Sequence, residues 1–136
     1  MAGKSARVVG DPDRLHTYTF IDDFGKALAV LGERDEALGK VWHVPSAPAM
    51  TTRHFVEAIY RALSKPARLS SAPRFTIRLA GLFDANMKEL FEMLYQFERD
   101  FEMVSSRFEK TFGMSPTPPD EAIRQTLEWY RARKQG

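Results

Sequence analysis

The sequence predicts an α/β fold, and three observations support this prediction. Short runs rich in β-branched and aromatic residues alternate with segments whose apolar residues recur at helical spacing. Clusters of proline, glycine and aspartate separate these runs, as expected for turns. The second half of the chain carries mostly helical patterns. We therefore expect one domain over 1–136, with strands and helices in 1–65 and a mostly helical part in 66–136.

Three strands and two helices are predicted in the first 65 residues. The predicted strands are 6–10, 17–21 and 41–44. Asp22 or Asp23 can cap the first helix by accepting backbone N–H bonds. The buried stripe of that helix is predicted to be Phe24, Ala27, Leu28 and Leu31.

The second helix has clear boundaries in the sequence. Thr51 or Thr52 is the predicted cap, and Pro66 is the predicted end. Its inner face is predicted to be Phe55, Ile59 and Leu63.

Residues 66–136 are expected to contain one more short strand, over 67–71, followed by helices. One helix opens at Pro73 and carries Phe75, Leu79 and Leu82. A stronger helix spans 87–97, with Leu90, Phe91, Leu94 and Phe97 facing inward. A short helix begins at Ser105 or Ser106, holds Phe108 and Phe112, and ends at Gly113.

The last helix has the clearest start signal. Thr117 is the predicted cap, Pro118 the first helical residue, and Asp120 takes the capping-box position. The predicted inward stripe is Ile123, Leu127 and Tyr130, with Trp129 half-buried at its edge.

Composition narrows the possible classes of protein. The chain has 43% hydrophobic residues, 12% aromatic residues and no cysteine, so it is globular and has no disulfide or thiol site. Its net charge is only +2, without a basic stripe, so we expect no nucleic-acid partner. No apolar run approaches the ~20 residues of a membrane span, and the N-terminus lacks a signal-peptide core. We expect a soluble, cytoplasmic protein with no membrane partner.

Cofactor and metal motifs are missing from the sequence. Gly25, Gly32 and Gly39 are too widely spaced for the G-x-G-x-x-G dinucleotide fingerprint, and no phosphate-binding P-loop is present. The histidines do not pair with acidic residues at metal-ligand spacing, so no metal site is predicted. His43 is expected to be a packed or hydrogen-bonded strand residue.

Two further patterns could indicate catalysis, but both have simpler explanations. Asp22 and Asp23 could form an acid/base pair, although helix capping accounts for them more simply. Tyr130 and Lys134 match Y-x-x-x-K, the catalytic pattern of short-chain dehydrogenases. Tyr130, however, continues an apolar helix stripe, and Lys134 lies in a polar tail. We therefore predict no catalytic residue.

Three stretches resemble the NAD-dependent epimerase/dehydratase family, the extended class of short-chain dehydrogenases/reductases. GDPDRLHTYTFIDDFGKAL resembles the segment that joins the sixth strand of the family's Rossmann sheet to the next helix. KVWHVPSAPAMTTRHFVEAI resembles the following strand and helix. SSRFEKTFGMSPTPPDEAIRQTLEWYR resembles the C-terminal signature of the family. The resemblance implies the last strands of a Rossmann-type sheet plus a mostly helical C-terminal substrate-binding domain.

The resemblance also implies that the cofactor-binding half of such an enzyme is missing. In the family, the glycine fingerprint and the catalytic Tyr/Lys pair lie upstream of these stretches. We expect this chain to bind no cofactor alone, whereas a full-length relative would use NAD or NADP. The chain is then a gene fragment, a split protein or a piece of a longer enzyme.

The same resemblance suggests a substrate site. Family members that act on nucleotide-diphosphate sugars often have arginine where His16 stands, and arginines where this chain has Asp100 and Glu102. Carboxylates repel a diphosphate, so we expect a small, non-nucleotide carbonyl or hydroxyl substrate. The candidate substrate-binding residues are His16, Tyr18, Tyr95 and Gln96.

Two functions are expected on these grounds. The first is the substrate-binding portion of an NAD-dependent epimerase/dehydratase-like oxidoreductase, not redox-competent alone. The alternative is a non-catalytic interaction module that pairs with a partner chain, or with a second copy of itself, through an exposed sheet edge.

Overall fold

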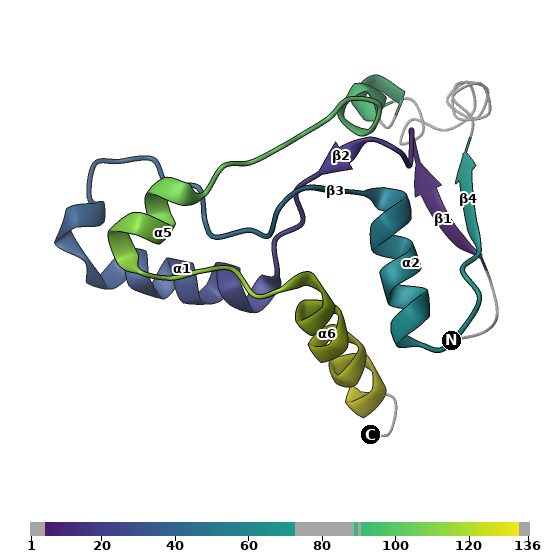
Figure 1. The fold of residues 1–136 in the computed structure, drawn as a ribbon. Helices are drawn as coiled ribbons and strands as arrows, with labels where there is room; N and C mark the ends of the chain where they lie inside the picture. The colour runs from purple at the N-terminus through teal and green to yellow at the C-terminus, as the bar shows by residue number, and fades with distance from the viewer. Residues whose placement is uncertain (1–4, 73–88, 90, 134–136) are drawn as a thin grey trace. The chain divides into compact units, whose positions relative to one another are not determined.

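The structure is a computed structural model of the 136-residue chain, and it describes residues 5–72, 89 and 91–133. These residues form a mixed α/β structure (Figure 1). The strands are β1 (Ala6–Val9), β2 (Leu15–His16), β3 (Met50–Thr51) and β4 (Leu69–Ala72). The helices are α1 (Ile21–Glu33), α2 (Thr52–Ala62), α5 (Ser106–Phe112) and α6 (Pro119–Arg133), with 3₁₀ turns η1 (Asp35–Ala37) and η2 (Leu94–Phe97).

The chain divides into two compact units, each built from two separate segments. The first unit comprises Met1–His16 and Met50–Phe101. The second unit comprises Thr17–Ala49 and Glu102–Gly136. These borders do not coincide with the expected division near residue 65. That division followed the change in residue pattern along the chain, whereas contacts between segments far apart in the sequence define the two units.

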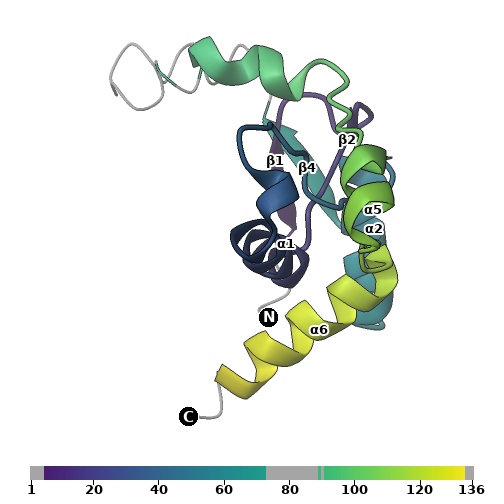
Figure 2. The same cartoon turned by 90° about the vertical axis from the view of Figure 1, so that its left-hand side faces the viewer.

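The first unit contains two small sheets. β1 and β4 are parallel, with Ala6 beside Leu69, and they lie side by side in Figures 1 and 2. β2 and β3 are antiparallel, with His16 opposite Met50. The connection from β1 to β4 contains β2, α1, η1, β3 and α2, and it is long enough for the crossover that parallel strands need. The predicted strands 6–10 and 67–71 are therefore confirmed within one or two residues.

Helix α2 begins as predicted but ends differently. The Thr51 hydroxyl accepts a hydrogen bond from the backbone N–H of His54 at 3.1 Å, which confirms the cap. The helix ends at Ala62, and Ser64 has a φ of +54°, so the chain turns before Pro66 is reached. The buried residues are Val56 and Ala58, while the predicted Phe55, Ile59 and Leu63 are half-buried.

Two predicted strands, 17–21 and 41–44, are wrong. In the described structure neither segment joins a ladder, and α1 already begins at Ile21. Their side chains form other bonds: the hydroxyls of Thr19 and Ser46 are 2.7 Å apart, and the Trp42 indole donates to the Ala37 carbonyl at 3.0 Å. β-propensity describes how a side chain fits a pleated surface, and a strand forms only where a partner is present.

An aromatic cluster lies in the core of the second unit. Phe108 on α5 is 1% exposed, and its ring centroid lies 4.7 Å from that of Phe112 and 6.2 Å from that of Trp42. The Arg107 guanidinium carbon lies 4.5 Å from the Trp42 ring centroid. α5 ends at Gly113, whose φ is +68°, so its predicted boundaries and buried Phe108 are confirmed.

Helix α1 buries a narrower stripe than predicted. Ala27 is fully buried and Leu31 half-buried, but Phe24 is 41% exposed and Leu28 is 52% exposed. No side chain caps the helix, so the prediction that Asp22 or Asp23 is the cap is wrong. Phe20 occupies the cap position instead.

Helix α6 starts one residue later than predicted. It begins at Pro119, and the carbonyl of Pro118 accepts the backbone N–H of Ala122 at 3.0 Å. Ile123 and Leu127 are buried, as predicted. Tyr130 is 51% exposed, so its predicted place in the core is wrong, and Trp129 is exposed beside it.

The predicted helix that opens at Pro73, and Leu90 of the next one, lie outside the described residues. Residues 89 and 91–93 are helical and continue into η2, where Leu94 is fully buried. Phe91 is half-buried, but Phe97 is 38% exposed, which corrects its predicted inward position. Within the described part of the chain, no helix is long and apolar enough to cross a bilayer.

Candidate functional site

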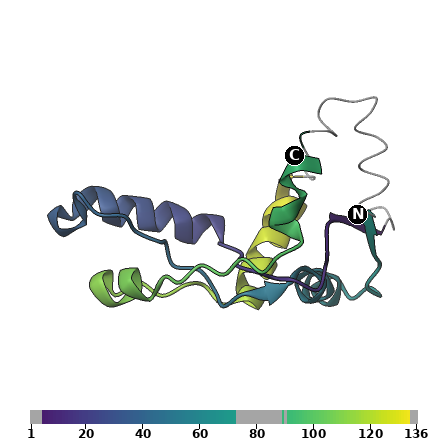
Figure 3. The same cartoon turned by 90° about the horizontal axis from the view of Figure 1, so that it is seen from above.

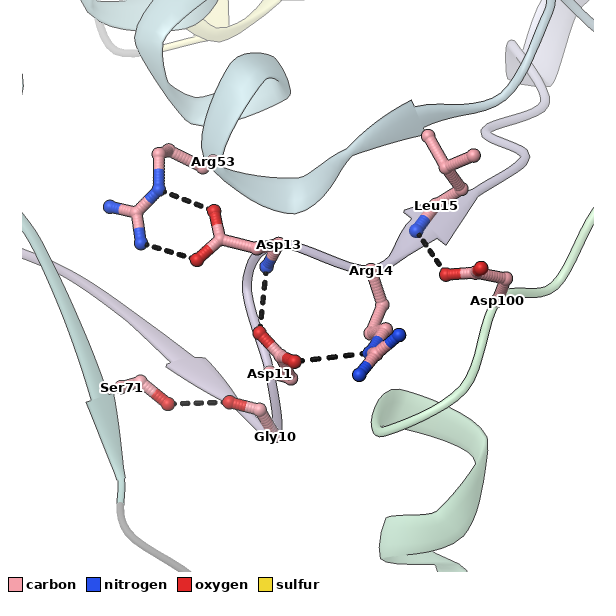
Figure 4. Close-up of polar contacts among 8 residues, drawn as sticks. All are labelled: Gly10, Asp11, Asp13, Arg14, Leu15, Arg53, Ser71 and Asp100. Carbon is pink, nitrogen blue, oxygen red and sulfur yellow. Dashed lines mark hydrogen bonds and ion pairs between the residues drawn. The ribbon is translucent and has the colours of Figure 1, made fainter.

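The carboxyl ends of β1 and β4 form the candidate site in the first unit. Because the strands are parallel, both ends lie at the same edge of the sheet. The Ser71 hydroxyl near the end of β4 donates to the Gly10 carbonyl just after β1 at 2.5 Å (Figure 4). Ligands of open α/β sheets bind outside this edge, since the loops that follow the strands converge there.

Gly10 allows η2 to pack against this edge. Its φ is +76°, a conformation that favours glycine. A Cβ on Gly10 would lie 2.5 Å from the Cβ of Phe97 and 2.6 Å from its carbonyl oxygen. The backbone N–H of Asp11 donates to the same carbonyl at 3.1 Å. The loop after β1 therefore contacts the turn that carries Tyr95 and Gln96.

Two aspartates organise the loop that follows Gly10. The Asp11 carboxylate accepts the backbone N–H of Asp13 at 3.0 Å and the Arg14 Nε at 3.1 Å. Asp13 in turn binds Arg53 of α2 through two parallel bonds of 2.6 and 2.9 Å (Figure 4). This fork lowers the pKa of Asp13 and raises that of Arg53, chiefly through the hydrogen bonds between them.

Arg14 is a candidate binding group that the sequence patterns did not single out. Only its Nε bonds to Asp11, and in the described structure its terminal nitrogens have no bond to another residue. Those N–H groups can therefore receive a carboxylate or carbonyl oxygen of a ligand. The available signal was the GDPDR turn directly after a predicted strand, because loops at strand ends carry function.

Three of the four predicted site residues lie in the first unit. His16 is half-buried in β2 and also bridges to Phe101. Tyr95 and Gln96 are exposed on η2, where the Gln96 amide donates to the Tyr95 hydroxyl at 3.3 Å. Tyr18 is half-buried in the second unit. The structure thus brings Tyr95 and Gln96 together beside the loop after β1.

Asp100 has a structural contact near His16. Its Oδ1 accepts the backbone N–H of Leu15 at 2.9 Å, and the Leu15 carbonyl accepts the backbone N–H of Phe101 at 2.8 Å (Figure 4). Asp100 therefore fixes the segment before Phe101 to β2. Its carboxylate differs from those of Asp11 and Asp13, which form ion pairs with Arg14 and Arg53.

Asp23 acts as a buried tether in the second unit. It is 2% exposed, and its two carboxylate oxygens accept the backbone N–H and the hydroxyl of Thr117 at 2.6 and 2.7 Å. Thr117 is therefore bound to α1 and does not cap α6, which corrects the predicted role of both residues. Asp22 is exposed, and with Asp23 fully engaged the pair has no free acid/base geometry.

Other polar residues of the second unit are also structural. The Ser105 hydroxyl donates to Glu109 at 2.7 Å and accepts the backbone N–H of Ser46 at 3.3 Å. His43 Nδ1 lies 3.1 Å from the Val104 carbonyl, so it is hydrogen-bonded as predicted, although not in a strand. Tyr130 packs on Trp129 with ring centroids 4.9 Å apart, and Lys134 lies outside the described residues.

Comparison with known proteins assigns no family to this arrangement. No protein-family model matches the chain, and no curated protein matches it.

Proposed function

We propose that the chain is the substrate-binding portion of an NAD-dependent epimerase/dehydratase-like oxidoreductase and is not redox-competent alone. One structural observation supports the proposal most directly: the parallel strands β1 and β4 end beside a polar loop. This is the edge at which α/β proteins bind their ligands. The three stretches that resemble the family supply the second support.

The substrate proposed for this site is a small, non-nucleotide carbonyl or hydroxyl compound. Tyr95 and Gln96 offer exposed polar groups beside the loop, and His16 lies in the same unit. Arg14 adds a cation that can hold one carboxylate. Asp100 disfavours a diphosphate more than a single carboxylate, because the repulsion by its carboxylate grows with the negative charge of the ligand, whereas Asp11 and Asp13 are already paired with Arg14 and Arg53. Tyr18 remains a candidate from the sequence.

Cofactor titration tests the absence of redox competence. The sequence has no glycine-rich turn at a helix N-terminus to cradle a pyrophosphate. NAD and NADP should therefore bind no tighter than about millimolar in isothermal calorimetry, which corresponds to ~4 kcal/mol. A micromolar dissociation constant for either nucleotide would contradict the proposal.

Amide chemical-shift mapping tests the substrate site. We would titrate the full chain with pyruvate and lactate, a 2-oxo acid and a 2-hydroxy acid that each carry one carboxylate. Shift changes should concentrate in residues 10–16 and 94–101. Arg14→Ala should weaken them, whereas the control Arg131→Ala, an exposed α6 residue, should not. Shifts distributed without preference for this edge would count against the site.

The alternative function is an interaction module that pairs through a sheet edge. Within the described residues, β1 and β4 pair only with each other, so each has an outer edge available for a further strand. The same titration separates the two proposals. If the ligands cause no chemical-shift changes and the β1 and β4 amide signals broaden as the protein concentration rises, the interaction module is favoured.

A further inference from the structure

The charged side chains around the loop after β1 are mostly paired. The Arg14 Nε donates to Asp11 at 3.1 Å. Arg53 donates to both carboxylate oxygens of Asp13, at 2.6 and 2.9 Å. Each pair combines one positive and one negative charge, so neither pair adds net charge to the site. Asp100 differs, because its carboxylate forms no ion pair with any residue that the structure describes.

Asp100 is held next to the cation of the loop. Its Oδ1 accepts the backbone N–H of Leu15, the residue directly after Arg14, at 2.9 Å (Figure 4). The side chain is exposed, so solvent and ligands reach the carboxylate. Glu98 and Arg99, which precede it, carry opposite charges and do not change the local balance. The site therefore keeps one negative charge beside Arg14.

Arg14 offers room for one carboxylate. Because Asp11 occupies the Nε, a ligand carboxylate binds across the two terminal nitrogens. A second carboxylate on the same ligand finds no other guanidinium within residues 10–16, and Asp13 already holds Arg53. It meets the repulsion of Asp100 instead.

We infer that this edge of the first unit accepts a monocarboxylate and rejects a dicarboxylate of similar size, and that Asp100 is the residue that determines this specificity. The selectivity rests on the proposed substrate-binding function and narrows its substrate to a small monocarboxylate. L-Lactate and L-malate are suitable probes, because malate is lactate with a carboxylate in place of one methyl hydrogen. The ratio of their affinities reports the effect of the second charge.

Asp100→Asn tests the inference without removing the structural contact. The asparagine oxygen still accepts the backbone N–H of Leu15, whereas the negative charge is lost. Amide chemical shifts of the full chain give both affinities. At about 20 mM ionic strength, the malate affinity should rise at least about threefold relative to the lactate affinity, as expected for unit charges about 8 Å apart near a surface. In about 0.5 M sodium chloride most of this gain should disappear, because salt screens exposed charges. A purely structural role of Asp100 would give no such salt dependence.

Glu57→Gln is the charge-matched control. Glu57 is an exposed residue of the same unit, one helical turn beyond Arg53 on α2. This helix leads away from β3 in Figure 1 and is viewed along its axis in Figure 3. The substitution removes the same charge from a position farther along the helix, so the affinity ratio should change much less than in Asp100→Asn.

The titrations separate failure of the selectivity from failure of the proposed function. If lactate causes no shift changes concentrated in residues 10–16 and 94–101, the substrate site is wrong, and the selectivity is overturned with it. If lactate binds there but Asp100→Asn leaves the affinity ratio unchanged, or Glu57→Gln changes it equally, only the selectivity is overturned.

Discussion

Gly10 shows how one residue sets the geometry of the candidate site. Its positive φ turns the chain after β1, and its missing Cβ makes room for Phe97. The sequence indicated a turn at GDPD but gave no sign of Phe97, which lies far along the chain. The conformational requirement could therefore be predicted from local residues, whereas the steric requirement depends on a distant contact.

Gly10→Ala should lower the free energy of unfolding by about 3 kcal/mol, since backbone strain and a clash with a carbonyl oxygen act together. Gly39→Ala is the matched control, because Gly39 has a φ of +67° but nothing within 4 Å of its Cβ position. The Gly39→Ala variant should lose only about 1–2 kcal/mol of unfolding free energy, through backbone strain. Urea denaturation measures the free energy of unfolding of both variants. Equal losses would mean that Phe97 moves away from the new Cβ without a measurable effect on stability.

Asp23→Ala should destabilise the second unit by about 3 kcal/mol, because two charge-assisted hydrogen bonds are lost and the half-buried Thr117 donors lose their acceptor. Asp22→Ala, next to it on the exposed side, should change stability by no more than about 0.5 kcal/mol. Tryptophan fluorescence in urea suits this test, since Trp42 and Trp129 both lie in the second unit. Similar losses in the two variants would contradict the tether.

At the level of elements, α6 combines a predicted core stripe with an unpredicted start. Helical periodicity predicts the burial of Ile123 and Leu127, because it identifies the buried face of any helix that packs on a core. The helix start differs because Asp23 competes with the helix for the Thr117 side chain. A capping motif describes local preference, and a buried carboxylate from another helix is a stronger acceptor.

Leu127→Ala should lower the free energy of unfolding by about 2–5 kcal/mol, because a buried side chain leaves a cavity. Tyr130→Ala should lose less than about 1 kcal/mol, since half of that side chain is exposed. Denaturant-induced unfolding of the two variants measures both losses of unfolding free energy. Equal, small losses would show that α6 is loosely attached to its unit.

Arg124 joins Glu121 and Glu128 on the exposed side of α6. Hydrogen bonds from Arg124 and then Gln125 lower the pKa of Glu121 to about 2, from an ordinary 4.5. The Glu121 carboxylate is therefore protonated more readily in the unfolded chain than in the folded one. The stabilisation that Glu121 contributes is complete above pH 4.5 and disappears as the pH falls through about 2. Glu121→Gln should flatten the pH dependence of α6 helicity in that window, and 1 M salt should reduce the difference. An unchanged profile would show that the exposed pairs contribute nothing.

At the level of the whole molecule, stability should be unevenly distributed. β1 and β4 form a two-stranded sheet in the described structure, and such a sheet is marginal without further strands or helices on its faces. Helices α1 and α6 are instead fixed by buried Ala27, Ile123 and Leu127.

Hydrogen exchange measures this distribution directly. Amides of β1 should exchange at least about tenfold faster than those of Ala27 and Leu127, because opening a two-stranded ribbon exposes little apolar surface. A partner or ligand that covers the sheet edge should slow the β1 amides selectively. Equal protection throughout the chain would mean that β1 and β4 open only with the whole molecule.

The sequence by itself determined the α/β class, the β1 and β4 segments, a cap of α2 at Thr51 or Thr52, the end of α5 at Gly113 and the buried Ile123 and Leu127. These features depend on residues a few positions apart, whose periodicity and turn chemistry act locally. Only the tertiary structure decided the rest. Asp23 and Thr117 are 94 residues apart, and the strands expected at 17–21 and 41–44 needed partners that the described structure does not provide. Long-range contacts of this kind leave no local pattern, because any acceptor or strand of suitable chemistry elsewhere in the chain satisfies the same residues.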